Sequence, residues 1–236
     1  MTTYVFPPAP LPFLPVAGTR DVFPVRRIFC VGQNYALHAA EMGAKAGQSD
    51  EMPIFFMKPA DCLTHDGDRV AYPPLTANLH HEVELVVALK SGGRDIPETA
   101  ALDHVFGYTV GLDLTRRDLQ AAAKAAGKPW DMAKSFDDAA PCGLLIPAGT
   151  LAHHPPRGFI QLSVNGALRQ DGRLEDMIWP VPRLIHLLSR HITLGAGDLL
   201  MTGTPAGVGP LLPGDKVDAS IEGIGDLSIT VQHAAG

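Results

Sequence analysis

The chain of 236 residues lacks the features that mark several protein classes. Its three cysteines, Cys30, Cys62 and Cys142, are an odd number without Cys-x-x-Cys spacing. The sequence therefore predicts neither a disulfide framework nor a zinc knuckle. We expect free thiols in a reducing compartment. Runs of Lys or Arg do not exceed two residues, and 25 Asp and Glu outnumber 19 Lys and Arg. The sequence therefore has no basic stripe for a nucleic-acid backbone.

Long hydrophobic runs are also missing. No stretch reaches the roughly 18 apolar residues of a transmembrane helix. Residues 1–18 contain five prolines and none of the positive charge that begins a signal peptide. These absences predict a cytoplasmic protein that binds neither a membrane nor a nucleic acid.

Glycine and proline, with 24 and 21 residues, are abundant and scattered, which favours short strands and turns. We predict an extended Pro-rich arm over residues 1–24 and a single catalytic domain over residues 25–236. Strands are expected at 28–31, 80–89 and 104–113, and a type I′ hairpin at Asn165-Gly166. Helices are expected at 34–42, capped by Asn34, at 115–126 and at 181–192. The pattern indicates an α+β fold with a curved mixed or antiparallel sheet.

Several common catalytic motifs are absent. The sequence has no GxSxG, no GxxxxGK[ST] and no HExxH, since Leu85 stands where the second zinc-binding histidine would be. The stretch GTPAGVG lacks the order of a dinucleotide-binding loop. These gaps argue against a nucleophilic-elbow hydrolase, a P-loop enzyme, a zinc protease and a dinucleotide-binding enzyme.

Three carboxylates are candidate ligands for a metal. Glu82 and Glu84 lie two residues apart in an expected strand, so their side chains share one face. Asp113 ends another apolar strand. A cluster of carboxylates without thiolates suits Mg²⁺ or Mn²⁺. The alternative is a solvated edge of a half-buried strand.

Other polar groups have both a functional and an ordinary interpretation. His38 and Glu41 are three residues apart on one helix face, where Glu41 could support His38 as a general base, or the two could form a surface pair. A capping box of Thr115 and Asp118 is expected to start the next helix. On that helix Arg117, Gln120 and Lys124 share a face, which could equally be ordinary polar surface. Lys134 could be catalytic or solvated.

Seven segments together resemble one known family. They are VGQNYALHAAEMG, FFMKP, HHEVELVVAL, GYTVGLDLTRRDLQ, PWDMAKSFD, VNGALRQDG and MTGTPAGVGP, in this order. The resemblance is to the fumarylacetoacetate hydrolase family, in its short single-domain branch of fumarylpyruvate hydrolases and acylpyruvases, over roughly residues 25–230. It implies a curved mixed β-sheet roll with a few peripheral helices, and a homodimer.

The resemblance also implies roles for particular residues. Glu82, Glu84 and Asp113 would bind Mg²⁺ or Mn²⁺. His38 and Glu41 would activate water on a mobile lid that Gly32, Gly43 and Gly47 allow to close.

Substrate contacts would come from Arg117, Gln120, Thr204 and the catalytic Lys134. Many relatives carry arginine where this chain has Gln33, and if that arginine meets a substrate carboxylate in those relatives, this chain would recognise the far end of its substrate differently.

The predicted function is metal-dependent hydrolysis of the C–C bond of acylpyruvates, which are 2,4-diketo acids, with fumarylpyruvate giving fumarate and pyruvate. His38 would deprotonate the water, and Lys134 would lie beside the developing oxyanion. A decarboxylase of oxaloacetate or another β-keto acid, or an enol-acid isomerase, is the alternative, because the same metal site serves all three reactions. A silent metal-binding scaffold is the non-enzymatic alternative.

Overall fold

A computed structural model describes residues 2–43 and 51–233 of the chain. Its largest sheet has eight strands, of which β15–β3 and β11–β5 pair in parallel and the other neighbours antiparallel. In spatial order the strands are β4 (Ile54–Lys58), β3 (Arg27–Gly32), β15 (Asp198–Met201), β8 (Val83–Leu89), β9 (Val105–Leu112), β11 (Ala140–Cys142) and β5 (Leu63–His65), with β12 (Ile146–Pro147) also on β9.

Three smaller sheets complete the strand layers. One has five strands, in the order β14 (Ala167–Arg173), β13 (Phe159–Val164), β17 (Lys216–Ile221), β18 (Gly225–Gln232) and β6 (Arg69–Ala71). Another has three strands, β10 (Thr115–Arg116), β7 (Leu79–His81) and β16 (Gly209–Leu211). The last is the hairpin of β1 (Phe13–Pro15) and β2 (Val22–Pro24).

The helices are short and peripheral. The α-helices are α1 (Ala36–Glu41), α2 (Arg117–Ala125), α3 (Asp131–Lys134) and α4 (Val181–His191). The 3₁₀ turns are η1 (Ala60–Cys62), η2 (Glu98–His104), η3 (Ala148–Thr150) and η4 (Leu174–Asp176). None of these helices, in the residues that the structure describes, is both long enough and apolar enough to span a bilayer.

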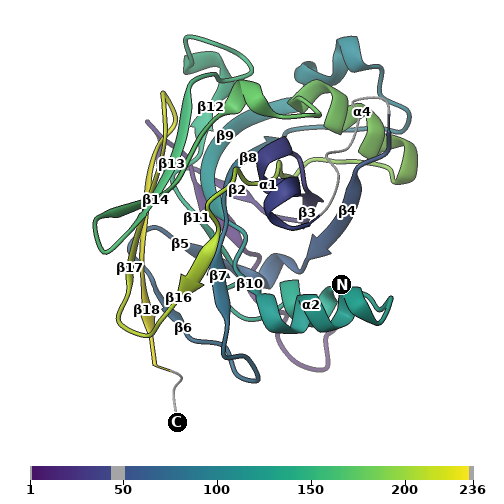
Figure 1. Cartoon of the computed structure of the whole chain (residues 1–236). Helices are drawn as coiled ribbons and strands as arrows, with labels where there is room; N and C mark the ends of the chain where they lie inside the picture. Colours follow the sequence, from purple (N-terminus) through teal and green to yellow (C-terminus); the bar gives the residue numbers. More distant parts are fainter. Residues whose placement is uncertain (1, 44–50, 234–236) are drawn as a thin grey trace.

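The strands curl around the interior, as Figure 1 shows, with the five-stranded sheet on one side and α4 and α2 at the periphery. One hydrophobic cluster runs through the roll and includes residues from Leu14 to Val231. β8 is buried along its whole length, because it is a central strand with both faces covered. The predicted α+β fold with a curved mixed sheet and few helices is confirmed.

Several local predictions are also confirmed. Residues 28–31 lie in β3, and residues 181–191 form α4. Asn165 and Gly166 join β13 to β14 with φ angles of 52° and 78°, the left-handed values that a type I′ turn requires. Gly43 and Gly127 follow the ends of α1 and α2 with φ angles of 69° and 61°.

The expected strand over residues 80–89 is wrong in one respect, since it breaks at Glu82. Residues 79–81 belong to β7, which pairs with β10 and β16, whereas β8 begins at Val83 and pairs with β9 and β15. At the break, the Glu82 carbonyl accepts a hydrogen bond from the Asp113 amide at 2.9 Å. The chain passes from one sheet to another here, which places Glu82 and Asp113 side by side.

Both predicted helix caps are wrong, because tertiary partners take the capping side chains. The N-cap of α1 is Tyr35, while the Asn34 amide bonds the backbone of Thr202 and Trp179. The N-cap of α2 is Arg116, and the Asp118 carboxylate accepts bonds from Thr76, Ala77 and Leu119. These side chains tie each helix to distant segments instead of capping it.

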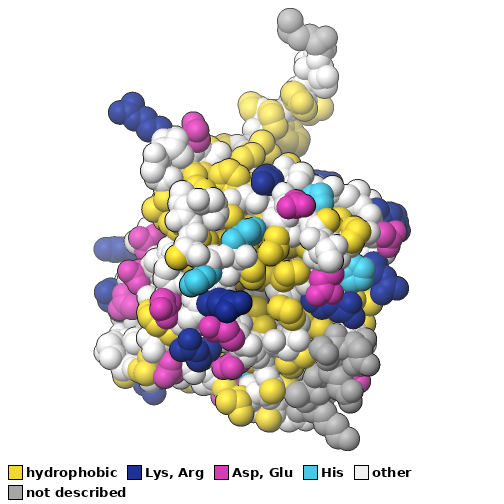
Figure 2. All heavy atoms as spheres, turned by 90° about the horizontal axis from the view of Figure 1, so that it is seen from above, with side chains coloured by type: hydrophobic (Ala, Val, Ile, Leu, Met, Phe, Trp, Pro, Cys, Tyr) yellow, Lys and Arg dark blue, Asp and Glu magenta, His cyan; other side chains and the backbone are white. Residues whose placement is uncertain are grey.

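The N-terminal segment has two parts. Residues 13–24 form the β1–β2 hairpin, whose Leu14 and Phe23 are buried in the core. Tyr4, Val5 and Phe6 are 64%, 100% and 74% exposed. Figure 2 shows hydrophobic side chains on a chain end that projects from the body. The division into a 1–24 arm and a 25–236 domain stays a prediction.

Candidate active site

Adjacent strands bring the three predicted carboxylates together. Glu84 lies on β8 opposite Gly111 of β9, Glu82 comes directly before β8, and Asp113 directly after β9. Their potential ligand atoms all lie within 4.8 Å of one another. The three residues are 4%, 1% and 1% exposed for Glu82, Glu84 and Asp113, respectively. The solvated-edge alternative therefore does not describe these carboxylates.

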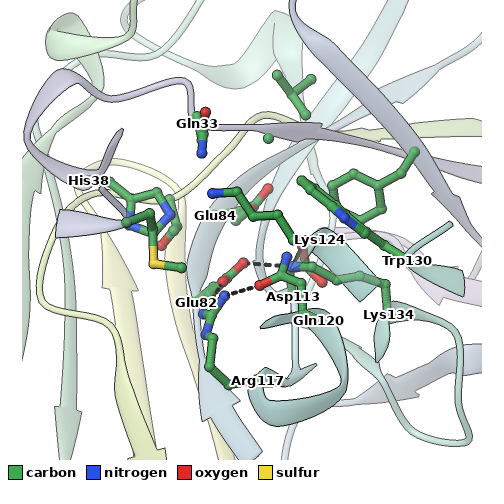
Figure 3. A pocket seen from close by; sticks show the side chains of 15 residues that line it. Gln33, His38, Glu82, Glu84, Asp113, Arg117, Gln120, Lys124, Trp130 and Lys134 are labelled. Carbon is green, nitrogen blue, oxygen red and sulfur yellow. Dashed lines mark hydrogen bonds and ion pairs between the residues drawn. The ribbon is translucent and has the colours of Figure 1, made fainter. Parts of the chain in front are cut away.

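Three cationic side chains surround two of the carboxylates, and Figure 3 shows two of these cations, Lys134 and Arg117. Lys134 donates to Glu82 Oε2 at 2.9 Å and to Asp113 Oδ2 at 2.6 Å. Arg117 pairs with Glu82 through its other carboxylate oxygen, and Lys58 Nζ lies 2.9 Å from Asp113 Oδ1. Burial alone would raise the pKa of Glu82, but Lys134 and Arg117 together lower it well below its usual range.

Glu84 has a different environment. In the described part of the chain it forms no ion pair, and its Oε2 accepts a hydrogen bond from the Gly203 amide at 2.7 Å. Burial raises the pKa of Glu84 well above its usual value, and the charges of Asp113 and Glu82 raise it further. A buried carboxylate facing two others fits a divalent cation, which would neutralise the excess negative charge. The donor set, three carboxylates without a thiolate, suits a hard cation such as Mg²⁺ or Mn²⁺.

The predicted dyad lies on α1. His38 Nδ1 is 3.3 Å from Glu41 Oε2. His38 is buried at 5% exposed, whereas the Glu41 side chain is 35% exposed and also accepts a bond from the Gly207 amide. The Gly207 contact links α1 to the loop after β15. Gly47, one of the three glycines predicted to let the lid close, lies outside the described residues.

Three of the predicted substrate contacts, Arg117, Gln120 and Lys134, are connected through hydrogen bonds and ion pairs beside the carboxylates. Arg117 donates to Gln120 Oε1 at 2.5 Å and to His80 Nδ1 at 3.3 Å. Burial and the charge of Arg117 lower the pKa of His80 to about 4, so its ring is neutral and can accept this bond. Lys134, on α3, is buried and is not a solvated lysine.

One pocket collects the predicted site residues except Glu41. Figure 3 shows His38 on one side of the carboxylates and Trp130 and Lys134 on the other. The lining residues are Val31, Gly32, Gln33, His38, Met42, Phe56, Glu82, Glu84, Asp113, Arg117, Gln120, Lys124, Trp130, Lys134 and Thr204. The arrangement combines a metal-binding carboxylate cluster with a histidine and several fixed cations.

Two residues that contact the site were not predicted from the sequence, Lys58 and Gln170. Lys58 is buried and donates to the backbone carbonyls of Leu114 and Lys134 as well as facing Asp113. Its signal was a charge at the end of the apolar run IFFM.

Gln170 is fully buried between β8 and the loop after β15. Its Oε1 accepts from the Val83 amide at 3.1 Å, and its Nε2 donates to Thr204 Oγ1 at 2.8 Å. Its presence in VNGALRQDG gave no sign of this contact, because a hairpin strand carries polar residues at every second position.

Comparisons with known proteins converge on one family. A model described as fumarylacetoacetate (FAA) hydrolase C-terminal matches residues 27–232. The mitochondrial oxaloacetate tautomerase FAHD1 of Mus musculus is 41% identical over 209 residues, which are 89% of this chain and 93% of that protein.

Solved structures match the chain over nearly its full length. The crystal structure of fumarylpyruvate hydrolase from Pseudomonas aeruginosa, in complex with Mn²⁺ and pyruvate, has a TM-score of 0.94 at 44% identity and covers 98% of this chain and 100% of its own. A candidate fumarylpyruvate hydrolase from Burkholderia cenocepacia has a TM-score of 0.91 at 50% identity and covers 99% and 100%. The three carboxylates lie inside residues 27–232, which the family model matches.

Proposed function

The chain belongs to the fumarylacetoacetate hydrolase family, and on that premise we propose that it hydrolyses acylpyruvates, with fumarylpyruvate as substrate and fumarate and pyruvate as products. The observation that carries the proposal is the meeting of the buried Glu82, Glu84 and Asp113 with His38 in one pocket. The similarity to a fumarylpyruvate hydrolase that binds Mn²⁺ and pyruvate supports it.

The reaction needs a water molecule, a proton acceptor and a place for negative charge. His38 takes a proton from the water, whose oxygen attacks the keto carbon farther from the pyruvate carboxylate. The bond between that carbon and the methylene carbon that separates the two keto groups then breaks. The acyl fragment leaves as a carboxylic acid, and the other fragment takes up a proton and becomes pyruvate. A divalent cation held by Glu82, Glu84 and Asp113 would supply a Lewis acid for the α-keto acid end.

The remaining residues orient the substrate and supply charge. Glu41 holds the His38 ring through Nδ1. Lys134 is held by Glu82 and Asp113, which raise its pKa although burial alone would lower it, so it stays an ammonium. Arg117, Gln120 and Thr204 bind the carboxylate and keto oxygens of the substrate.

The test is an assay of the purified protein with Mg²⁺ or Mn²⁺ and fumarylpyruvate. Pyruvate is measured through lactate dehydrogenase, and fumarate by chromatography. We expect equal amounts of both products, and no turnover in excess chelator. Failure to release pyruvate at saturating metal would overturn the proposal.

Oxaloacetate tautomerisation is the second candidate, since the Mus musculus relative carries that name. Decarboxylation of oxaloacetate is a third outcome at the same site. The enol content of oxaloacetate, followed by its ultraviolet absorbance, and the release of CO₂ distinguish these two reactions from acylpyruvate hydrolysis. Acceleration of enol loss without pyruvate release from fumarylpyruvate would favour the tautomerase.

We also propose that the protein is a homodimer, because the exposed Tyr4, Val5 and Phe6 offer apolar surface that a second copy could cover. Sedimentation equilibrium should give twice the chain mass of 25.1 kDa at micromolar concentration. A species with the mass of one chain would contradict the proposal.

A further inference from the structure

The pocket continues outward from the carboxylate cluster along α2. A second, adjoining pocket is lined by Met42, Arg117, Gln120, Ala121, Lys124 and Ala125. It shares Met42, Arg117, Gln120 and Lys124 with the pocket that holds the carboxylates. The two adjoining pockets leave room for an elongated molecule to reach from the carboxylates to the space between the end of α1 and the exposed face of α2.

The cationic side chains of this pocket differ in whether they form ion pairs with carboxylates of the protein. Lys134 forms ion pairs with Glu82 and Asp113, and Arg117 forms an ion pair with Glu82. The Lys124 side chain is exposed, and among residues 2–43 and 51–233 its ammonium group donates no hydrogen bond and forms no ion pair. It is thus the lining cation whose charge the described residues leave available.

Helix geometry places Lys124 away from the reacting end. Arg117, Gln120 and Lys124 follow one another at intervals of three and four residues, so they share one face of α2. Seven residues of helix span about 10 Å along its axis. A long side chain on a helix leans toward the helix N-terminus, which directs Lys124 over the turn that carries Gln120.

Gln33 adds a second polar group to the same pocket. Its backbone has a φ of 60°, a left-handed conformation that is uncommon for residues other than glycine and concentrates at functional sites. The pocket between these groups is walled by Phe56 and Trp130, whose rings pack edge to face at 6.0 Å. Apolar walls with a free ammonium and an amide suit a flat carbon chain that ends in a carboxylate.

We propose that Lys124 binds the carboxylate at the far end of a dicarboxylic acylpyruvate and so selects substrates with an acid group at both ends. This inference rests on the proposed function, because it requires the α-keto acid end to lie at Glu82, Glu84 and Asp113. An ordinary surface lysine near a helix C-terminus, favoured by the helix dipole, would make no such distinction.

The test uses two unreactive ligands that differ only at the far end. They are 2-oxoheptanedioate, which has the chain length of fumarylpyruvate, and 2-oxoheptanoate, which lacks the second carboxylate. Neither has the second keto group that hydrolysis requires. Calorimetry with the Mg²⁺-loaded protein gives both dissociation constants for the wild type, Lys124→Met, Lys124→Arg and the control Lys128→Met, which removes an exposed lysine beyond the end of the same helix.

We expect the wild type to bind the diacid about 5-fold to 10-fold more tightly than the monoacid, as a partly exposed charged hydrogen bond would give. Lys124→Met should reduce this ratio to about one, whereas Lys124→Arg and Lys128→Met should retain it. A ratio that survives in Lys124→Met, or disappears in Lys128→Met, would overturn the inference, as would failure of both ligands to bind. Absence of fumarylpyruvate cleavage would instead refute the proposed function, since this comparison needs no turnover.

Discussion

The two ends of the active-site pocket are built in opposite ways. The inner end consists of Glu82, Glu84 and Asp113 with Lys134, all at most 4% exposed and held by several contacts. The outer end contains Lys124, which is exposed and has no partner in the residues that the structure describes. The charged side chains of the inner end are held in place by other residues of the protein, whereas the ammonium group of Lys124 at the outer end is available to bind a substrate.

This difference has energetic consequences. Removing a cation such as Lys134 leaves its buried partners Glu82 and Asp113 uncompensated, which costs several kcal/mol. A change at an exposed charge is screened by water and salt and alters binding by a fold-change of order ten or less. On the proposed function, we therefore expect reaction chemistry at the inner end and substrate selection at the outer end.

The largest effect is expected for Glu84→Gln. The glutamine keeps an oxygen that can accept the Gly203 amide, but the site loses one negative ligand. We expect turnover to fall by more than about 10³-fold, as for loss of a group that stabilises transition-state charge. Thermal stabilisation of the protein by Mg²⁺ or Mn²⁺ should disappear as well.

Glu98→Gln is the matched control, because Glu98 is exposed and pairs with Arg183 at the surface. It should keep both activity and metal-induced stabilisation. The metal-free Glu84→Gln protein should be at least as stable as the wild type, since one buried like charge is removed. Wild-type metal dependence in Glu84→Gln would show that the three carboxylates are not the metal site.

His38→Ala should have the next largest effect. Loss of a general base lowers the rate by about 10²-fold to 10⁴-fold. Binding of oxalate, a mimic of the keto acid end, should change little because the three carboxylates remain. An unchanged kcat would contradict the assignment of His38 as the base.

Glu41→Gln should lower kcat less, by about tenfold. Glutamine keeps an acceptor for the His38 ring and for the Gly207 amide, and only the charge support is lost. Steady-state kinetics beside His38→Ala measures the difference. If both substitutions changed the rate less than about twofold, the pair would be an ordinary surface contact.

Gln170→Leu tests how the inner end is supported. The change leaves the buried Val83 amide and Pro205 carbonyl without their side-chain partner, so the free energy of unfolding should fall by about 2–4 kcal/mol. We expect kcat/KM to fall about threefold to tenfold as Thr204 loses its anchor. Gln161→Leu, which removes an exposed bond to Asp171, should change the free energy of unfolding by less than about 0.5 kcal/mol.

Gln33→Arg should have the smallest effect and acts at the outer end. A second cation near the far carboxylate should lower the KM for fumarylpyruvate about twofold to threefold, with kcat nearly unchanged. The same variant should bind 2-oxoheptanoate as the wild type does. If the affinity for 2-oxoheptanoate rose as much as the KM for fumarylpyruvate fell, the new arginine would contact the keto acid end instead.

The sequence predicted those parts of the fold and site that depend on local spacing. The two-residue interval of Glu82 and Glu84, the three-residue interval of His38 and Glu41, and the Asn165-Gly166 turn all rest on neighbours along the chain. The end of an apolar strand indicated Asp113, a single charge in an apolar stretch drew attention to Lys134, and the family resemblance added Thr204.

Features that depend on distant partners could not be predicted. Asn34 does not cap α1, because the backbones of Thr202 and Trp179 compete for its amide. The strand break at Glu82 comes from pairing with two different sheets. Lys58 faces Asp113 only once β3 and β4 have joined the sheet that holds β9. In each case a residue far away in the chain decides the outcome.

The central claim is that the carboxylate cluster holds a metal that is required for acylpyruvate hydrolysis. The most direct test is a titration of metal-depleted protein with Mn²⁺ while pyruvate release from fumarylpyruvate is recorded. The account predicts that the rate rises from baseline, saturates at one Mn²⁺ per chain and returns to baseline on chelation. Pyruvate release that is unaffected by chelation, or absent at saturating Mn²⁺, would contradict it.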